Sequence, residues 1–145
     1  MEPQFDLVAS SRHKAKALED AIINEGIQTI DIPIRHYFAH NLYAREMFLA
    51  EGTVLVGKIH KYSQINILSQ GTVSVLTEKG LELLSAPHTF VGPPGAKRVF
   101  CALTDVTWTV IHATDETDVD KIEEIFIAPD EKSFIEFSRR LEVKP

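Results

Sequence analysis

Apolar residues recur along the chain at two spacings, which separate helical from extended segments. A first helix is predicted over about residues 10–26, where Ser10 or Ser11 can cap the start and Gly26 can end it. Its apolar residues share one helix face and charged residues fill the other, the stripe being Ala15, Leu18 and Ile22. This helix is predicted to pack against the rest of the domain or against a partner subunit.

Between residues 27 and 112 the apolar spacing changes to the alternation of extended chain. Short segments rich in Val, Ile, Leu and Phe are separated by turn residues. The predicted strands cover residues 27–35 and 43–49, two strands within 52–71, then 72–77, 81–85, 89–92, 98–103 and 107–112. Residues 36–41 are predicted to be an irregular aromatic connection. No helical pattern separates the later strands, so an all-β sandwich or small barrel is expected.

The last part of the chain has two different patterns. Residues 113–124 are acidic and weakly periodic, which predicts a solvated loop. A second helix is predicted over about residues 129–142, because Pro129, Asp130 and Glu131 suit a helix start. Its apolar stripe contains Phe134, Phe137 and Leu141. The whole chain is expected to form one domain, residues 1–145, with the β structure over about residues 27–127.

Composition narrows the classes of function. The 145 residues carry a net charge of −6 and no basic stretch, which argues against nucleic-acid binding. No segment is apolar for long enough to span a membrane, and no signal-peptide pattern is present. One cysteine, Cys101, excludes an internal disulfide. A cytoplasmic location is therefore expected.

The stretch from Gly52 to Gly71 carries the most specific spacing in the chain. Lys58, His60 and Gln64 interrupt a run of Val, Ile and Leu, in the frame Gly-x5-Lys-x-His-x3-Gln-x6-Gly. This frame resembles the first motif of the cupin superfamily. The resemblance implies a cupin-like double-stranded β-helix, or jelly roll, with the predicted helices added at its two ends.

A second stretch, PGAKRVFCA, resembles the second cupin motif. Pro93 and Gly95 precede Arg98, and residues 72–86 separate the two frames, as in short cupins. The resemblance covers roughly residues 43–112. The general phrasing of the sequence is also similar to that of small cupin-like proteins carried by bacteriophages.

The residues at the family's metal-binding positions do not suit a metal. Two histidines, a glutamate and a last histidine usually hold the metal, whereas this chain has Lys58, His60, Gln64 and Arg98. Lysine and arginine stay protonated near neutral pH and offer no lone pair. We therefore expect no metal and no cofactor.

Two cations at these positions favour an anionic ligand, because arginine can bind carboxylate or phosphate through two hydrogen bonds. Strand alternation places further candidates in the same cavity. The predicted ligand-binding residues are Lys58, His60, Gln64, Arg98, Tyr43, Arg45 and Phe100, with His112 as a weaker candidate. The alternative is that Lys58 and Arg98 pair with acids inside a filled, inert barrel.

Three functions remain open from the sequence. We expect a metal-independent binding module for a small anionic molecule, such as a nucleotide or sugar derivative. A metal-independent isomerase or epimerase is the second hypothesis, with His60 as base and Lys58 or Arg98 stabilising negative charge. A structural or interaction protein is the third. Exposed strand edges and two apolar helix stripes predict a homodimer or higher oligomer.

Overall fold

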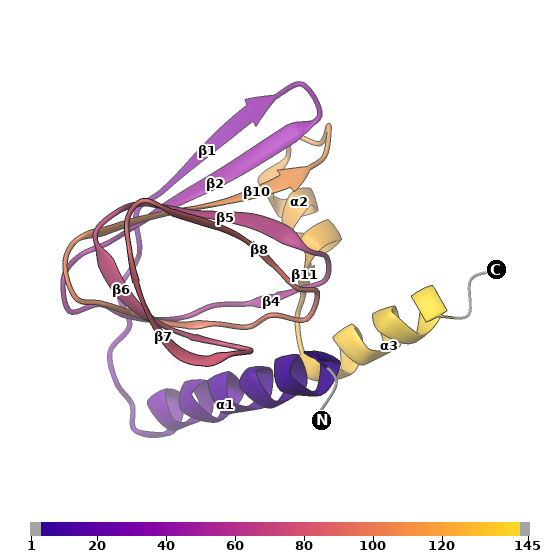
Figure 1. Ribbon diagram of the computed structural model, residues 1–145. Helices are drawn as coiled ribbons and strands as arrows, with labels where there is room; N and C mark the ends of the chain where they lie inside the picture. Colours follow the sequence, from indigo (N-terminus) through magenta and orange to yellow (C-terminus); the bar gives the residue numbers. More distant parts are fainter. Residues whose placement is uncertain (1–3, 143–145) are drawn as a thin grey trace.

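A computed structural model describes residues 4–142, which form two facing antiparallel sheets with helices added at both chain ends (Figure 1). The larger sheet has the strand order β1-β2-β10-β5-β8, with β1 at Ile34–Ala39, β2 at Leu42–Leu49, β10 at Val106–Ala113, β5 at Gln64–Gln70 and β8 at His88–Gly92. The smaller sheet has the order β3-β9-β6-β7, with β3 at Val54–Val56, β9 at Val99–Ala102, β6 at Thr72–Thr77 and β7 at Gly80–Ser85. A short pair joins β4, Ile59–His60, to β11, Ile127–Ala128.

The order of the strands is that of a jelly roll, in which neighbours in space are distant in sequence. Strand β10 lies between β2 and β5, and β9 lies between β3 and β6. Side chains alternate along each strand, so every second residue points between the sheets. The apolar core there contains Met47, Leu49, Leu68, Val73, Val75, Phe100, Ala102, Val106, Trp108 and Val110. The predicted all-β fold with a helix near each end is confirmed.

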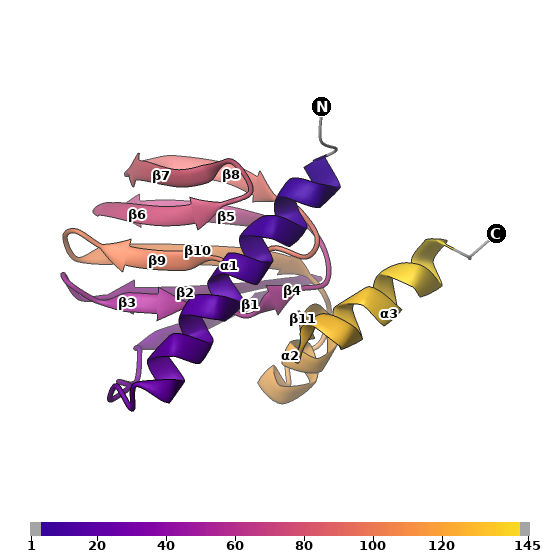
Figure 2. The same ribbon diagram turned by 90° about the horizontal axis from the view of Figure 1, so that it is seen from below.

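The first helix, α1, spans Gln4–Asn24 and lies across the outer face of the smaller sheet (Figure 2). It contacts β3 and β6. It begins earlier than the sequence predicted, so Ser10 and Ser11 lie within the helix rather than at its cap. The residues that it buries against the domain include Val8 and Ala15.

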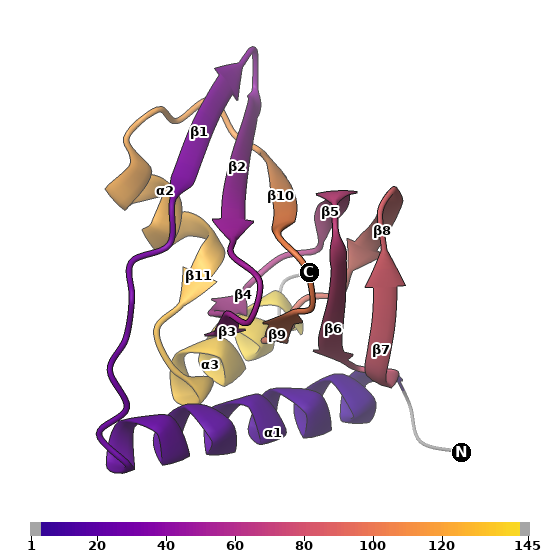
Figure 3. The same ribbon diagram turned by 90° about the vertical axis from the view of Figure 1, so that its left-hand side faces the viewer.

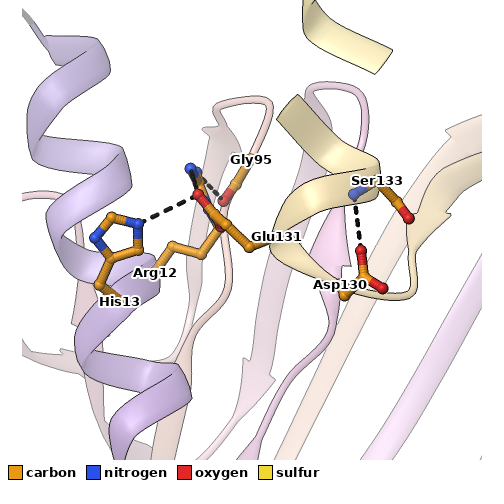
Figure 4. A network of polar contacts seen from close by, with 6 residues as sticks. All are labelled: Arg12, His13, Gly95, Asp130, Glu131 and Ser133. Atoms are coloured by element: carbon orange, nitrogen blue, oxygen red, sulfur yellow. Dashed lines mark hydrogen bonds and ion pairs between the residues drawn. The ribbon is translucent and has the colours of Figure 1, made fainter. Parts of the chain in front are cut away.

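Two buried cations and their carboxylate partners attach α1 to the domain. Arg12 is 2% exposed, and its guanidinium donates to both carboxylate oxygens of Glu131 and, at 3.1 Å, to the carbonyl oxygen of Gly95 (Figure 4). This hydrogen bonding holds the pKa of Glu131 below its usual range. Lys97 lies 3.3 Å from Glu19 and donates to a backbone carbonyl. Each of these cations therefore has an acid partner, as buried charges generally require.

The segment after α1 differs from the prediction. Only residues 34–35 of the expected strand over residues 27–35 are extended in a sheet, and Ile30 is 68% exposed. The aromatic segment predicted as a loop instead forms most of β1, which pairs with β2 in a hairpin (Figure 3). The turn of this hairpin contains Asn41 with φ of 57°, a conformation that asparagine tolerates.

Two further segments differ from expectation. Residues 52–71 contain three strands rather than two, because Gly57 and Lys58 break the chain between β3 and β4. The acidic segment predicted as a loop, residues 113–124, contains most of helix α2, Val119–Phe126. The backbone of Asp120 in this helix donates to the Asp118 side chain. Acidic residues near a helix N-terminus interact favourably with its dipole.

The final helix, α3, spans Glu131–Glu142 and confirms the predicted C-terminal helix. Asp130 caps it by accepting a hydrogen bond from the Ser133 backbone at 2.7 Å (Figure 4). Phe134 is buried with Ile59 and Ala128, so α3 packs on the β4–β11 pair. No helix within residues 4–142 is long and apolar enough to cross a membrane.

Candidate functional site

The inner face of the larger sheet changes from apolar to polar along its strands. At one end Met47 on β2 lies opposite Trp108 on β10, which lies opposite Leu68 on β5. Two residues further along, the corresponding row is Arg45, Val110, Asn66 and Phe90. Beyond that row, Tyr43 lies opposite His112 and Gln64 lies opposite Gly92. The candidate functional site is this polar end.

Arg98 lies at the centre of the polar end and is 4% exposed. Both of its terminal nitrogens lie 3.4 Å from Oε1 of Gln64, which is long for a hydrogen bond. Its guanidinium also lies over the Phe90 ring, 5.3 Å from the centroid. Among the described residues no carboxylate pairs with Arg98, and its buried Nε has no hydrogen-bond partner.

A chain of amide hydrogen bonds positions Gln64 for this contact. The Trp108 indole donates to Asn66 Oδ1 at 3.1 Å, and Asn66 Nδ2 donates to Gln64 Oε1 at 3.1 Å. Gln64 Nε2 donates to the carbonyl oxygen of Tyr62 at 2.8 Å. These bonds fix the amide so that its oxygen points toward Arg98.

Gly92 provides the space in which Gln64 and Arg98 meet. A Cβ atom at this position would overlap Gln64 Oε1 and Arg98 Nη2. The φ of Gly92 is not positive, so this glycine is required by the close approach of side chains rather than by its own backbone conformation.

His60 and His112 form a short aromatic stack, and the charge of Arg98 acts on His60. The His60 and His112 rings are 5.7 Å apart between centroids, and Phe126 of α2 stacks on His112 at 4.2 Å. Burial, helped by nearby positive charge, lowers the pKa of His60 to about 3 and that of His112 to about 4. Both imidazoles are therefore neutral at pH 7, and each has one donor and one acceptor nitrogen. The buried Nδ1 of His60 has no hydrogen-bond partner among the described residues.

Arg45 and Tyr43 lie where β2 approaches helix α2. Arg45 contributes to the lowered pKa of both histidines, which places its charge close to them. The Tyr43 hydroxyl lies 2.7 Å from His36 Nδ1, and burial raises the pKa of this tyrosine. Tyr43 packs with Ile122 and Phe126, so α2 covers the polar end of the barrel (Figure 1).

The structure brings together most of the residues that the sequence singled out, and it separates two. His60, Gln64 and Arg98 meet at the polar end with His112. Lys58 lies outside, with 64% of its side chain exposed, and forms an ion pair with Glu123 of α2. Phe100 belongs to the apolar end, where its ring lies against Trp108 at 4.9 Å.

Sequence reasoning missed three contributors to the site. Asn66 could have been predicted from strand alternation. It lies two residues from both Gln64 and Leu68, so all three side chains point to the same face of the strand. Phe126 lies just beyond the acidic segment that the sequence predicts as a loop, so no pattern there indicates that it ends a helix. The sequence pattern places Gly92 at the end of a strand, and only the packing shows that its lack of a side chain leaves room for Gln64 and Arg98.

The metal set of the cupin family does not fit these residues. Lys58 points to the surface, Arg98 is a cation, and the amide of Gln64 is a weak ligand for a transition metal. The described residues contain no group of three or more His, Cys, Asp or Glu side chains placed to hold an ion. His60 is the one good donor among the four positions of the motif.

The polar end is closely packed. Helix α2 covers it, and a narrow seam between α1 and the barrel is too thin to hold a water molecule. Arg98, Thr77 and Val8 are among the residues that line this seam. A ligand that reaches the histidines would therefore need α2 or α1 to move.

Comparisons with solved structures show the fold. The chain is similar to an RmlC-like cupin from Shewanella frigidimarina, with a TM-score of 0.52 and 20% identity over 63% of this chain and 86% of the other. It is also similar to a cupin superfamily protein from Desulfitobacterium hafniense, with a TM-score of 0.51 and 9% identity over 61% and 82% of the two chains.

A longer enzyme contains the same fold. Salicylate 1,2-dioxygenase from Pseudoaminobacter salicylatoxidans aligns with a TM-score of 0.52 and 16% identity, over 78% of this chain and 34% of that one. No family model and no curated protein matches the sequence. These likenesses establish a cupin jelly roll, and the function has to be argued from the site.

Proposed function

We propose that this protein is a metal-independent binding module for a small anionic molecule, such as a nucleotide or sugar derivative. The observation that carries the proposal is the environment of Arg98. Three cationic side chains are almost fully buried in the described residues, namely Arg12, Lys97 and Arg98. The first two have carboxylate partners, Glu131 and Glu19, whereas Arg98 has only the oxygen of an amide.

A buried cation without an anionic partner is costly, because the protein replaces only part of the hydration that it lost. Burial lowers the pKa of Arg98, and only the more distant charges of Glu78 and Glu82 oppose this effect. A carboxylate or phosphate oxygen would supply the missing charge and could accept from two nitrogens of the guanidinium. Arg45 would add to the attraction from the facing strand.

The neutral histidines complement this role. A neutral imidazole can donate from one nitrogen and accept at the other, so His60 and His112 can select hydroxyl or amide groups beside the anion. His60 Nδ1 is buried without a partner, which is unusual for a polar atom in a folded protein. Lys58 is not part of this proposed pocket because its side chain lies on the surface.

Enzymatic activity is the second candidate, since His60 and Arg98 together resemble a base beside a cation that stabilises negative charge. A general base works best when its pKa lies near the working pH. The lowered values of about 3 and 4 make His60 and His112 weak bases. The binding function is therefore preferred. A purely structural role would not explain why this buried arginine has no acid partner among the described residues.

Calorimetric titration with nucleotides, sugar phosphates and organic acids tests the proposal. At least one class should bind the wild type, and Arg98→Met should weaken that binding roughly ten- to a hundredfold, the loss of one charge-assisted contact. Arg98→Lys should restore it only in part, because lysine lacks the planar fork. Arg139→Met, on the exposed surface of α3, is the matched control and should bind as the wild type does.

Absence of binding by the wild type, or equal binding by Arg98→Met, would refute the anion pocket.

Metal independence is tested separately by elemental analysis of purified protein. We expect much less than one transition metal per chain, and a stoichiometric metal that His60→Ala removes would contradict this. We also propose a cytoplasmic protein that works as a homodimer or higher oligomer.

A further inference from the structure

Helices α1 and α2 both border the polar end of the barrel, and they are attached to it in different ways. On α1, Arg12 bonds to Glu131 of α3, and Glu19 lies beside Lys97 of the barrel. Both cations are almost fully buried. Displacing α1 would leave these two charges without partners, which is costly. Displacing α2 would have no such cost, because none of its charged residues is buried.

The charged contacts that hold α2 lie at the surface. Glu123 forms an ion pair with Lys58, and the two side chains are 46% and 64% exposed. Lys61 donates to the backbone carbonyl oxygen of Glu124 at 2.9 Å, also in an exposed position. Water competes for such contacts, so each of them contributes little to holding the helix against the barrel.

The underside of α2 carries two buried residues, Ile122 and Phe126. They form one apolar cluster with Tyr43, and the Phe126 ring stacks on His112 at 4.2 Å between centroids. His112 stacks in turn on His60. Lifting α2 would therefore uncover both imidazoles of the polar end.

The chain on either side of α2 suits such a movement. Residues 114–118, which precede the helix, belong to no helix or strand. After the helix, β11 pairs with β4 through only Ile127 and Ala128, and Ala128 is buried with Phe134. The backbone at Ile127 is extended, so the helix ends there. This junction separates a fixed residue, Ala128, from a helix with few attachments.

We propose that α2 is a lid over the anion pocket, which swings about its junction with β11 and is held shut by the ion pair between Lys58 and Glu123. This inference rests on the proposed binding function, because only a ligand that enters the polar end needs a lid. It assigns a role to Lys58, whose side chain lies at the surface rather than in the pocket. Lids of this kind control when a ligand enters and leaves.

A lid affects the rates of binding rather than the affinity. The ion pair is present whenever α2 is closed, with or without a ligand inside. Breaking the pair destabilises both closed states equally, so a ligand should enter and leave faster while its affinity stays the same. A residue that touches the ligand changes the affinity instead, as we expect for Arg98.

Chemical labelling of His112 measures the opening of α2 without any ligand. Diethyl pyrocarbonate reacts with neutral imidazoles, and His112 is only 8% exposed beneath Phe126. Peptide mass spectrometry at pH 7 gives the labelling rate of each histidine, with the exposed His40 as internal standard. In Glu123→Gln the rate at His112 should rise about two- to fivefold, the range expected for loss of an exposed ion pair.

Glu124→Gln is the matched control. It removes the same charge from the next residue of the same helix, and the Glu124 side chain forms no ion pair within residues 4–142. Its labelling rate at His112 should equal that of the wild type. Equal rates in Glu123→Gln and Glu124→Gln would overturn the proposal.

Hydrogen exchange of the β5 and β10 backbone amides shows whether the opening is local. The exchange rates in these strands should be the same in the wild type and in both variants, since only α2 moves. Faster exchange in these strands of Glu123→Gln would mean that the whole domain unfolds, and it would also overturn the proposal.

A variant of α1 tests the other route to the polar end. Glu19→Gln removes the acid partner of Lys97 and loosens α1 instead of α2. It should leave the labelling rate of His112 at the wild-type value. Faster labelling in Glu19→Gln than in Glu123→Gln, with β5 and β10 still protected, would place the entrance beneath α1 and contradict the lid.

Inorganic phosphate separates the lid from the pocket itself. Phosphate should slow the labelling of His112 relative to sodium chloride at the same ionic strength, in the wild type and in Glu123→Gln alike. If phosphate gives no protection and Glu123→Gln still reacts faster than Glu124→Gln, the lid stands and the anion pocket fails. If phosphate protects and the two variants react alike, the pocket stands and the lid is wrong.

Discussion

The two ends of the barrel interior are built from the same strands and differ in almost everything else. At one end Trp108, Leu68 and Met47 form a dry cluster, and Trp108 and Leu68 are fully buried. At the other end, two residues along the same strands, Arg45 and Asn66 face the interior instead. The first arrangement gains stability from apolar burial, and the second forgoes it. The apolar end therefore accounts for the stability of the barrel, and the polar end is where we propose that an anion binds.

Removing packing from the apolar end should have the largest effect. Leu68→Ala should reduce the free energy of unfolding by about 2–5 kcal/mol, because a fully buried leucine leaves a cavity between the sheets. Urea denaturation followed by circular dichroism measures the change. Leu81→Ala, on an exposed position of β7, should change stability by less than about 0.5 kcal/mol. A small effect at Leu68 would show that the supposed core contributes little.

Filling space at the polar end should have the next largest effect. Gly92→Ala inserts a methyl group where Gln64 and Arg98 meet and should cost about 1–3 kcal/mol by overpacking. Gly57→Ala is the matched control, because a Cβ atom there meets only ordinary contacts, the nearest at 3.4 Å. The prediction fails if the two variants unfold at the same urea concentration.

Acid should destabilise the protein through the polar end. The folded pKa values of His60 and His112, about 3 and about 4, lie below the ordinary 6.5, so the unfolded chain binds more protons between these values. The contribution of the two histidines to the free energy of unfolding is fully present above pH 6.5. It should fall as the pH drops, by at most about 1.4 kcal/mol per pH unit for each histidine. Carboxylates such as Glu131, whose pKa lies below 4.5, lose their contribution only at lower pH.

Unfolding measured from pH 7 to pH 5 isolates the histidines. His112→Gln should reduce this pH dependence by roughly half, since glutamine has no proton to gain while His60 still contributes. His40→Gln, an exposed position in the β1–β2 turn, should leave it unchanged. A wild-type stability that is constant across this range would contradict the burial of the two imidazoles in their neutral form.

The surface ion pair near the polar end should have the smallest effect. Lys58 and Glu123 are both largely exposed, so Lys58→Ala should change the free energy of unfolding by no more than about 1 kcal/mol. High salt should reduce this difference further. Binding of an anion at Arg98 should stay within about twofold of the wild type. A tenfold loss of anion affinity in calorimetry would show that Lys58 belongs to the binding site.

Much of the fold followed from local patterns in the sequence. Alternation located β2, β6, β7 and β10, and the helix stripe with its acidic start located α3. The patterns failed where two structures share one signal. The alternating isoleucines of residues 27–35 resemble a strand, yet most of them find no neighbouring strand to pair with. The acidic residues 113–124 show little apolar periodicity, yet they contain most of helix α2, whose buried face consists of Ile122 and Phe126.

The sequence predicted several residues of the site, but it did not predict how their side chains are oriented or which residues they contact. Motif spacing brought His60, Gln64 and Arg98 to attention, and they lie together. Strand alternation placed Lys58 beside His60, but the break at Gly57 turns the lysine to the surface. The contact between Phe126 and His112 joins residues from different elements, and no local pattern encodes it.

Stability measurements on Arg98→Met test most directly whether the polar end is retained for binding rather than for folding. Methionine fills similar space without a charge to desolvate. Because Arg98 has no acid partner among the described residues, the variant should be at least as stable as the wild type in urea denaturation. A loss of 2 kcal/mol or more, the scale expected for a residue of the apolar core, would show that Arg98 is a structural cation and contradict the account.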